Sequence, residues 1–135
     1  MANIEKIKTD LQKQTKGVWV DFALGIELKI ARARNPKYTE MVRNLTEHLR
    51  IKIRDDSIEI DELNEVLLKV RARTILLDWK NIEDKDGVAI PYSPEKAEEF
   101  FRDPELQDFY KFVQIVSDDA DQYRKELIEG IEKNS

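Results

Sequence analysis

Few side chains in this sequence combine the type and the spacing that chemistry requires. Residues 84–87, Asp-Lys-Asp-Gly, resemble part of a calcium-binding loop, in which Asp stands at position 1, glycine at position 6 and glutamate at position 12. With Gly87 at position 6, positions 1 and 12 fall on Ile82 and Ser93, so both end ligands are missing. We therefore interpret the segment as a tight turn in which Gly87 supplies a positive φ.

Side chains suited to catalysis are also scarce. His48 is the only histidine and cysteine is absent, which excludes a multi-histidine metal site, a thiolate site and a disulfide framework. Ser57 and Ser93 stand where helix caps are expected, and the isolated glycines form no phosphate-binding loop. Because no nucleophile, base and oxyanion donor come together, we predict that the protein is not an enzyme and has no catalytic, cofactor-binding or metal-binding residues.

The composition narrows the class of partner. The formal net charge of -5 opposes binding to nucleic acid through its phosphates, and basic residues do not cluster with aromatic ones. No apolar run is long enough for a membrane span, and residues 1–16 lack the apolar core of a secretory signal. We therefore expect a folded intracellular domain with a heavily charged surface and with neither nucleic-acid nor membrane partners.

The elements that position these residues follow from apolar periodicity. In residues 17–33, apolar and polar side chains alternate on both sides of Gly25, which predicts a β-hairpin with one buried face. Trp19 falls on the polar face, where either a neighbouring helix covers it or it anchors a partner. Residues 1–16 carry apolar side chains at helical spacing and form either a short amphipathic helix or a mobile arm.

Residues 35–135 are predicted to be helical. Asn35, Ser93 and Asp103 each precede a proline, which is the pattern of an N-cap followed by a first helical residue. The fold class is therefore mainly α: a single small helical domain over residues 1–135, with the N-terminal β-hairpin packed on its helices.

The apolar stripes set the expected helix lengths. The helix after Asn35 is expected to reach about Ile51, and a central, well-buried helix is expected to reach Leu77. The last helix carries apolar residues from Leu106 to Ile131, unless residues 117–119 end it earlier. A domain of this size cannot bury the whole stripe of an unbroken final helix, so we expect a homo-oligomer.

Several motifs occur together and in order. They are Gly-x-Trp-Val at residues 17–20, Ile-Ala-Arg at 30–32, Asn-Pro-x-Tyr at 35–38, and Leu-Leu-x-Trp-x-Asn followed by Asp-Gly-x-x-Ile-Pro-Tyr-Ser-Pro-Glu at 76–95. In these motifs the chain resembles the tail assembly chaperones of long-tailed (siphovirus-type) bacteriophages or prophages. The resemblance covers nearly everything after residue 16.

The resemblance implies a function in phage tail morphogenesis. Such a protein binds and solubilises the tape measure protein and helps recruit tail tube subunits through a longer form made by ribosomal frameshifting. Codons for residues 132–134, Glu-Lys-Asn, are compatible with a slippery sequence. The resemblance places the protein in the cytoplasm of the bacterial host and implies that it is absent from the mature virion.

Two groups of residues are candidates for this function. Those predicted to contact partners are aromatic residues of the hairpin and the last helix: Trp19, Tyr110, Phe112 and Tyr123. Those predicted to be structural lie in the distinctive connection, where Trp79 closes the central helix or contacts a client: Trp79, Gly87, Pro91 and Tyr92. Alternative functions are a structural head–tail connector or tail-completion protein, and an acidic inhibitor of a host DNA-handling protein.

Overall fold

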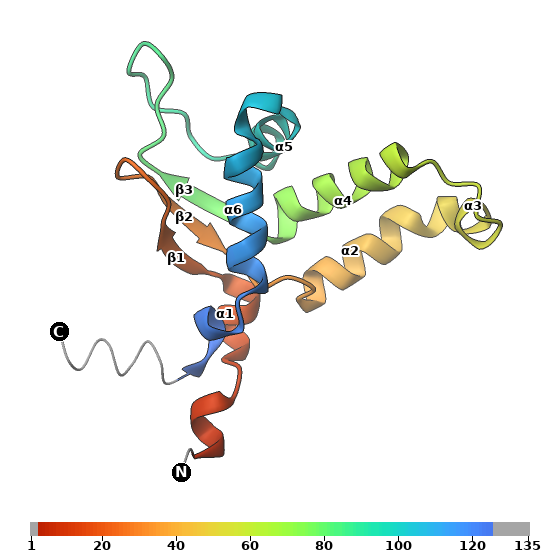
Figure 1. Ribbon diagram of the computed structural model, residues 1–135, viewed down its shortest axis with the longest axis horizontal. Helices are drawn as coiled ribbons and strands as arrows, with labels where there is room; N and C mark the ends of the chain where they lie inside the picture. The colour runs from red at the N-terminus through yellow and green to blue at the C-terminus, as the bar shows by residue number, and fades with distance from the viewer. Residues whose placement is uncertain (1–2, 126–135) are drawn as a thin grey trace.

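A computed structural model describes residues 3–125 of the chain, which form a small antiparallel sheet with helices on one side (Figure 1). The helices are α1 (Leu11–Lys16), α2 (Pro36–Thr46), α3 (Arg50–Arg54), α4 (Ile60–Thr74), α5 (Pro94–Arg102) and α6 (Gln107–Asp118). The strands are β1 (Val18–Asp21), β2 (Glu27–Ile30) and β3 (Leu76–Lys80). Short 3-10 turns are η1 (Ile4–Ile7), η2 (Glu47–Leu49), η3 (Pro104–Leu106) and η4 (Ala120–Tyr123). The predicted mainly α class is confirmed.

β1 and β2 form an antiparallel hairpin. Val18 lies opposite Ile30 and Val20 opposite Leu28, so the alternating apolar side chains share one face. Beyond the paired residues, the Phe22 amide donates to the Ile26 carbonyl at 2.9 Å. The turn itself needs positive φ, which Gly25 adopts at +81° without steric cost.

The central helix was predicted to reach Leu77, and this prediction is wrong. α4 ends at Thr74, and Leu76–Lys80 forms β3, which pairs antiparallel with β2 in the sheet order β1-β2-β3. A short apolar run fits helical and strand periodicity equally well, so its pattern alone does not decide. Pairing with β2 decides here, because it places Trp79 opposite Leu28 and buries Leu76 completely.

α2 and α4 pack along each other as an arm that extends away from the sheet (Figure 1). Asn35 caps α2 and is fully buried: its side-chain oxygen accepts from the Tyr38 amide, and its Nδ2 lies 2.8 Å from the Arg32 carbonyl and 3.1 Å from the Thr74 carbonyl. α2 does not run unbroken to Ile51. The Thr46 hydroxyl donates to the Val42 carbonyl at 2.6 Å, a bond that bends helices, and η2 and α3 follow.

The last helix ends at the polar residues 117–119, which the sequence marked as a possible helix end. α6 stops at Asp118, and Asp119 adopts an extended conformation and caps η4 through its bond from the Asp121 amide. A long unbroken final helix is therefore excluded, and with it the part of the homo-oligomer prediction that rested on that helix. Self-association remains a prediction without that support. Ile131 lies outside the described residues.

The N-terminal segment, which sequence periodicity left open, contains η1 and α1. It is joined to the end of the described chain, since the Asp10 amide donates to the Tyr123 carbonyl at 2.7 Å and Thr9 forms a β-bridge with Arg124. Residues 3–16 are thus a helical segment tied to the turn that follows α6.

One core joins the inner face of the sheet to α4, α5 and α6. Its buried members come from every one of these elements: Leu28, Ile30, Leu68, Ala72, Ile75, Leu76, Trp79, Ala97, Phe101, Phe109, Val113 and Val116. α4, α5 and α6 thus share one core with the sheet, and the connection at residues 81–93 joins β3 to α5.

Candidate protein-binding groove

An open cavity of about 410 Å³ lies between the sheet and the helices α5 and α6. Its wall comes from the β1–β2 turn, the connection after β3, the end of α5 and the start of α6. The apolar lining residues are Phe22, Ile26, Ile82, Ile90, Phe100, Leu106 and Phe109, and the acidic ones are Glu83, Glu105 and Asp108. We call this cavity the apolar groove.

The loop at residues 82–90 forms one wall of the apolar groove. The Ile90 amide donates to the Ile82 carbonyl at 2.8 Å, so the two ends of the loop lie next to each other. At its tip, the Asp84 carboxylate accepts from the amides of Asp86 and Val88, and Gly87 has φ +79°. The calcium-like segment is therefore a tight turn, and no group of metal-ligating side chains occurs among residues 3–125.

Aromatic rings form the floor of the apolar groove. The Phe109 ring stands edge-on to Phe22 at 5.6 Å and to Phe100 at 5.9 Å between centroids. Behind Phe100, the Trp79 ring stacks at 5.0 Å with an interplanar angle of 12°. The Trp79 indole N–H donates to the Ile90 carbonyl at 2.7 Å, so a single buried side chain supports both the floor and one wall.

Tyr92 supports Trp79 from the other side. Its ring meets the Trp79 ring edge-on at 5.0 Å, and its hydroxyl lies 2.6 Å from the Leu76 carbonyl and 3.1 Å from the Ala72 carbonyl. Burial raises the pKa of Tyr92 to about 12, and the nearby Asp78 carboxylate adds to the increase. Pro91, between Ile90 and Tyr92, is exposed.

The raised pKa of Tyr92 predicts a loss of stability in alkali. A tyrosine in the unfolded chain ionises near its ordinary pKa of 10.0, whereas Tyr92 in the fold keeps its proton to about 12. Its contribution is therefore complete below pH 10.0 and is lost as the pH rises toward 12, because the unfolded state then binds fewer protons. We expect the free energy of unfolding, measured in urea between about pH 9 and pH 11, to fall less steeply in Tyr92→Phe than in wild type. Equal slopes would contradict this prediction.

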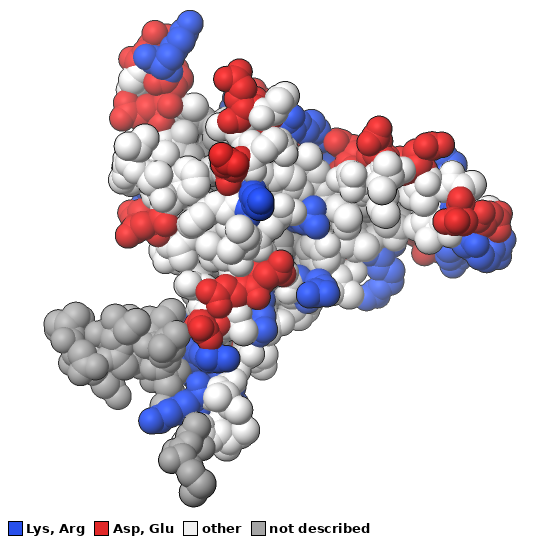
Figure 2. All heavy atoms as spheres, in the orientation of Figure 1, with Lys and Arg blue, Asp and Glu red and all other residues white. Residues whose placement is uncertain are grey.

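The rim of the apolar groove carries acidic side chains only. Glu83, Glu105 and Asp108 are exposed, no Lys or Arg lines the groove, and none of the three belongs to an ion pair within residues 3–125. Figure 2 shows acidic and basic atoms side by side at the tip of the loop after β3 and acidic atoms over the adjoining ends of α5 and α6, with mostly uncharged surface between them. The groove thus combines an apolar floor with acidic side chains that form no ion pair within residues 3–125.

The acidic residues of α5, in contrast, are paired. Glu98 is buried and its carboxylate lies 2.6 Å from Arg73, while Arg102 bridges Glu98 and Glu65. The hydrogen bond from Arg102 lowers the pKa of Glu65. These ion pairs join α4 to α5, which contributes to the groove wall, and they do not involve the rim carboxylates.

Trp19 lies away from the apolar groove. It pairs with Lys29 on the sheet face opposite to Leu28, keeps 38% of its surface exposed, and has the Lys80 ammonium 4.1 Å from its ring centroid. The Lys80 side chain thus lies over the Trp19 ring as a cation–π partner, and the rest of the indole remains accessible to solvent.

Of the contact residues predicted on the last helix, Tyr110 and Phe112 are half-buried against other aromatic rings, and Tyr123 is fully buried. Tyr110 stacks on Phe101 at 4.2 Å, and the Phe112 ring lies 4.9 Å from that of Phe22. Tyr123 has no exposed surface and its hydroxyl donates to the Ile30 carbonyl at 3.2 Å, so the structure corrects its assignment to a partner surface. Tyr123 follows α6 rather than continuing it, and the turn at η4 directs its ring into the core.

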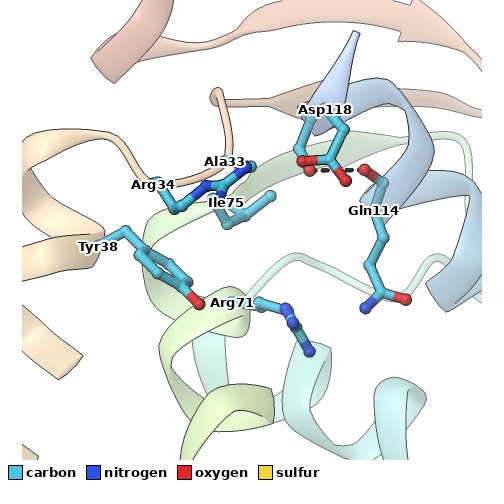
Figure 3. Close-up of a pocket in the computed structure, with 8 residues that line it drawn as sticks. Ala33, Arg34, Tyr38, Arg71, Ile75, Gln114 and Asp118 are labelled. Carbon is cyan, nitrogen blue, oxygen red and sulfur yellow. Dashed lines mark hydrogen bonds between the residues drawn. The ribbon is translucent and has the colours of Figure 1, made fainter.

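A second cavity, of about 230 Å³, lies between the start of α2, the end of α4 and the end of α6 (Figure 3). Figure 3 shows Tyr38 pointing toward Arg71, with Gln114 on the opposite wall. The Arg71 guanidinium already donates to the Tyr110 hydroxyl at 2.8 Å. This cavity is smaller and more polar than the apolar groove and offers no comparable apolar floor.

Sequence reasoning did not identify the groove residues as a site. Phe22, Phe100, Leu106 and Phe109 belong to the apolar patterns that also build the core. The acidic residues at 83, 105 and 108 lie among many other carboxylates. The one available signal is the high density of aromatic and acidic residues around the proline at 104.

Comparison with protein families decides the origin of the chain. The family described as YdaY prophage protein matches residues 33–134. The chain belongs to this family. No curated protein and no solved structure shows significant similarity to it.

The YdaY family match spans α2 through α6 and includes most of the apolar groove. Among the residues that line the groove, only Phe22 and Ile26 of the hairpin turn lie before the matched residues. No helix among residues 3–125 combines the length and the apolar character that crossing a membrane requires. The chain is therefore a prophage protein, and most residues that line the apolar groove lie within the family region.

Proposed function

We propose that this YdaY-family protein is a tail assembly chaperone that binds and solubilises the tape measure protein and helps recruit tail tube subunits. The observation that carries the proposal is the apolar groove, an open site that a segment of another protein can occupy. The motif block at residues 76–95, on which the resemblance to these chaperones mainly rests, forms β3, the groove loop and the start of α5. The resemblance and the groove therefore concern the same part of the molecule.

A groove of this kind suits reversible binding rather than chemistry. Each apolar client side chain that the groove fully buries contributes about 1.5–3 kcal/mol to the binding free energy. The client can therefore dissociate when it binds its final partners in the tail. We propose accordingly that the protein is not an enzyme and has no cofactor. Its partners on this proposal are the tape measure protein, tail tube subunits reached through a longer frameshifted form, and further copies of itself, in the bacterial cytoplasm.

Co-expression with the tape measure protein encoded beside it tests the proposal. We expect the tape measure protein to become soluble and to co-purify with the wild-type chain. Leu106→Glu should abolish co-purification, because it places a charge on the apolar lining. The matched control is Ile115→Glu, which changes an apolar residue of α6 that is 59% exposed and lies outside the groove. An insoluble tape measure protein beside the wild-type chain would refute the proposal.

Finished phage particles distinguish a chaperone from a tail component. A chaperone leaves when assembly ends, so we expect particles to lack the protein. Its retention in particles would favour the alternative of a head–tail connector or tail-completion protein.

A further inference from the structure

The lining of the apolar groove also indicates which kind of client segment it accepts. We infer that the groove binds an amphipathic helix that presents large apolar side chains on one face, flanked by Lys or Arg. This inference rests on the proposed function and specifies the chemistry of the client at that site.

The available contacts favour a helix over an extended strand. Around the groove, the backbone groups of Phe22 and Ile26 bond to each other, as do those of Ile82 and Ile90, and Phe109 lies within α6. The wall therefore offers side chains rather than a free strand edge, which is how grooves recognise amphipathic helices. A cavity of about 410 Å³ accepts a few side chains from one helix face, not a whole helix.

The acidic rim determines the charge of the client. Glu83, Glu105 and Asp108 surround an apolar floor without a lining cation. A basic residue beside the apolar anchors of a client would meet these carboxylates, whereas an acidic residue would be repelled. Attraction at an exposed rim acts through solvent, so salt should weaken it.

The same charge argument excludes the end of this chain as the occupant. Residues 126–135 include apolar side chains but also carry Glu126, Glu129 and Glu132 against a single Lys133. The excess of negative charge opposes binding to an acidic rim. We therefore assign the groove to another protein.

A pair of synthetic helical peptides tests the inference on the full-length protein. Both peptides share one apolar face of Leu and Ile and lack tryptophan; one has Lys on the polar face and the other has Glu. We expect the Lys peptide to bind about tenfold more tightly at low salt, with the difference shrinking as salt is added. Binding is read by calorimetry and, in a Trp19→Phe variant that leaves one tryptophan, by the fluorescence of Trp79, which lies behind Phe100 in the groove floor.

Rim variants identify the site of binding. Glu105→Gln combined with Asp108→Asn should remove most of the preference for the Lys peptide, while Leu106→Glu should remove binding of the apolar face. The control, Glu40→Gln with Asp61→Asn, neutralises exposed carboxylates on the arm and should change nothing. Equal binding of the two peptides, or a preference that survives the rim variant, overturns the inference.

The outcome is separable from that of the proposed function. If the tape measure protein co-purifies but the rim variant leaves its binding unchanged, the chaperone function stands and the inference fails. If the Lys peptide binds the groove selectively while the tape measure protein does not bind at all, the inference stands for a different client and the proposed function fails.

Discussion

Replacing Trp79 with alanine is expected to lower the free energy of unfolding by about 3–5 kcal/mol, the usual cost of removing a large buried aromatic side chain. Trp79 is 5% exposed, stacks on Phe100, and contacts the Tyr92 ring edge-on. Its indole N–H also holds the Ile90 carbonyl, so the variant leaves that acceptor unpaired in addition to creating a cavity. A loss of this size is a large fraction of the about 5–15 kcal/mol that a domain typically has.

Urea unfolding followed by circular dichroism measures this change. Trp19→Ala is the matched control, since it removes the same side chain from an exposed strand position, and it should cost less than about 1 kcal/mol. Trp79→Phe should fall between the two, because it keeps a ring beside Phe100 but loses the bond to Ile90. If Trp79→Ala and Trp19→Ala cost the same, Trp79 does not support the groove as described.

The second large effect is expected at Tyr123. Its ring has no exposed surface, its hydroxyl donates to the Ile30 carbonyl in β2, and its own carbonyl accepts from the Asp10 amide. Tyr123→Ala removes the packing and the hydrogen bond together and should cost about 3–5 kcal/mol. Tyr123→Phe retains the ring and should cost about 1 kcal/mol for the lost hydrogen bond.

Hydrogen exchange separates a local effect from a global one at this position. The Asp10 backbone bond ties the segment before α1 to η4, so loss of the Tyr123 ring should also expose amides at residues 10–16 to faster exchange. A Tyr123→Ala variant as stable as wild type, with protection at residues 10–16 unchanged, would show that the ring is not part of the core.

Stability and client binding can be tested by different substitutions. Trp79 and Tyr123 are buried and act on the whole fold, so their variants do not isolate the groove. Leu106 is partly exposed in η3, and the rim carboxylates are exposed, so substitutions there change the groove surface with less effect on the core. A variant that loses its client while retaining the wild-type unfolding curve therefore reports on the groove itself.

The sequence alone located the elements whose cause is local. The buried side-chain amide of Asn35 and the hydroxyl of Ser93 accept bonds from the first turns of α2 and α5, and Pro occupies the first helical position in both. Period-two alternation on either side of Gly25 likewise indicated the strands of the hairpin. A helix cap, or an alternation of apolar and polar residues, depends on residues that are neighbours in the chain, so it can be recognised in the sequence itself.

Elements that depend on distant residues were decided only in the tertiary structure. Residues 76–80 became a strand because β2 was available to pair with them. Residues 117–119 marked a possible helix end in the sequence, and the structure shows that α6 does end there and that the next turn carries Tyr123 into the core. Neither outcome follows from an apolar pattern that fits both alternatives.

The apolar groove is also a feature that only the tertiary structure decided. Phe22, Phe100, Leu106 and Phe109 have the composition of core residues, and their partial exposure results from how four separate segments meet. The rim is acidic because that meeting places carboxylates from the loop after β3, from η3 and from the start of α6 around one opening. From the sequence come the helix caps and the hairpin strands. The site depends on tertiary structure, because exposure and charge complementarity are properties of surfaces that exist only when distant segments pack together.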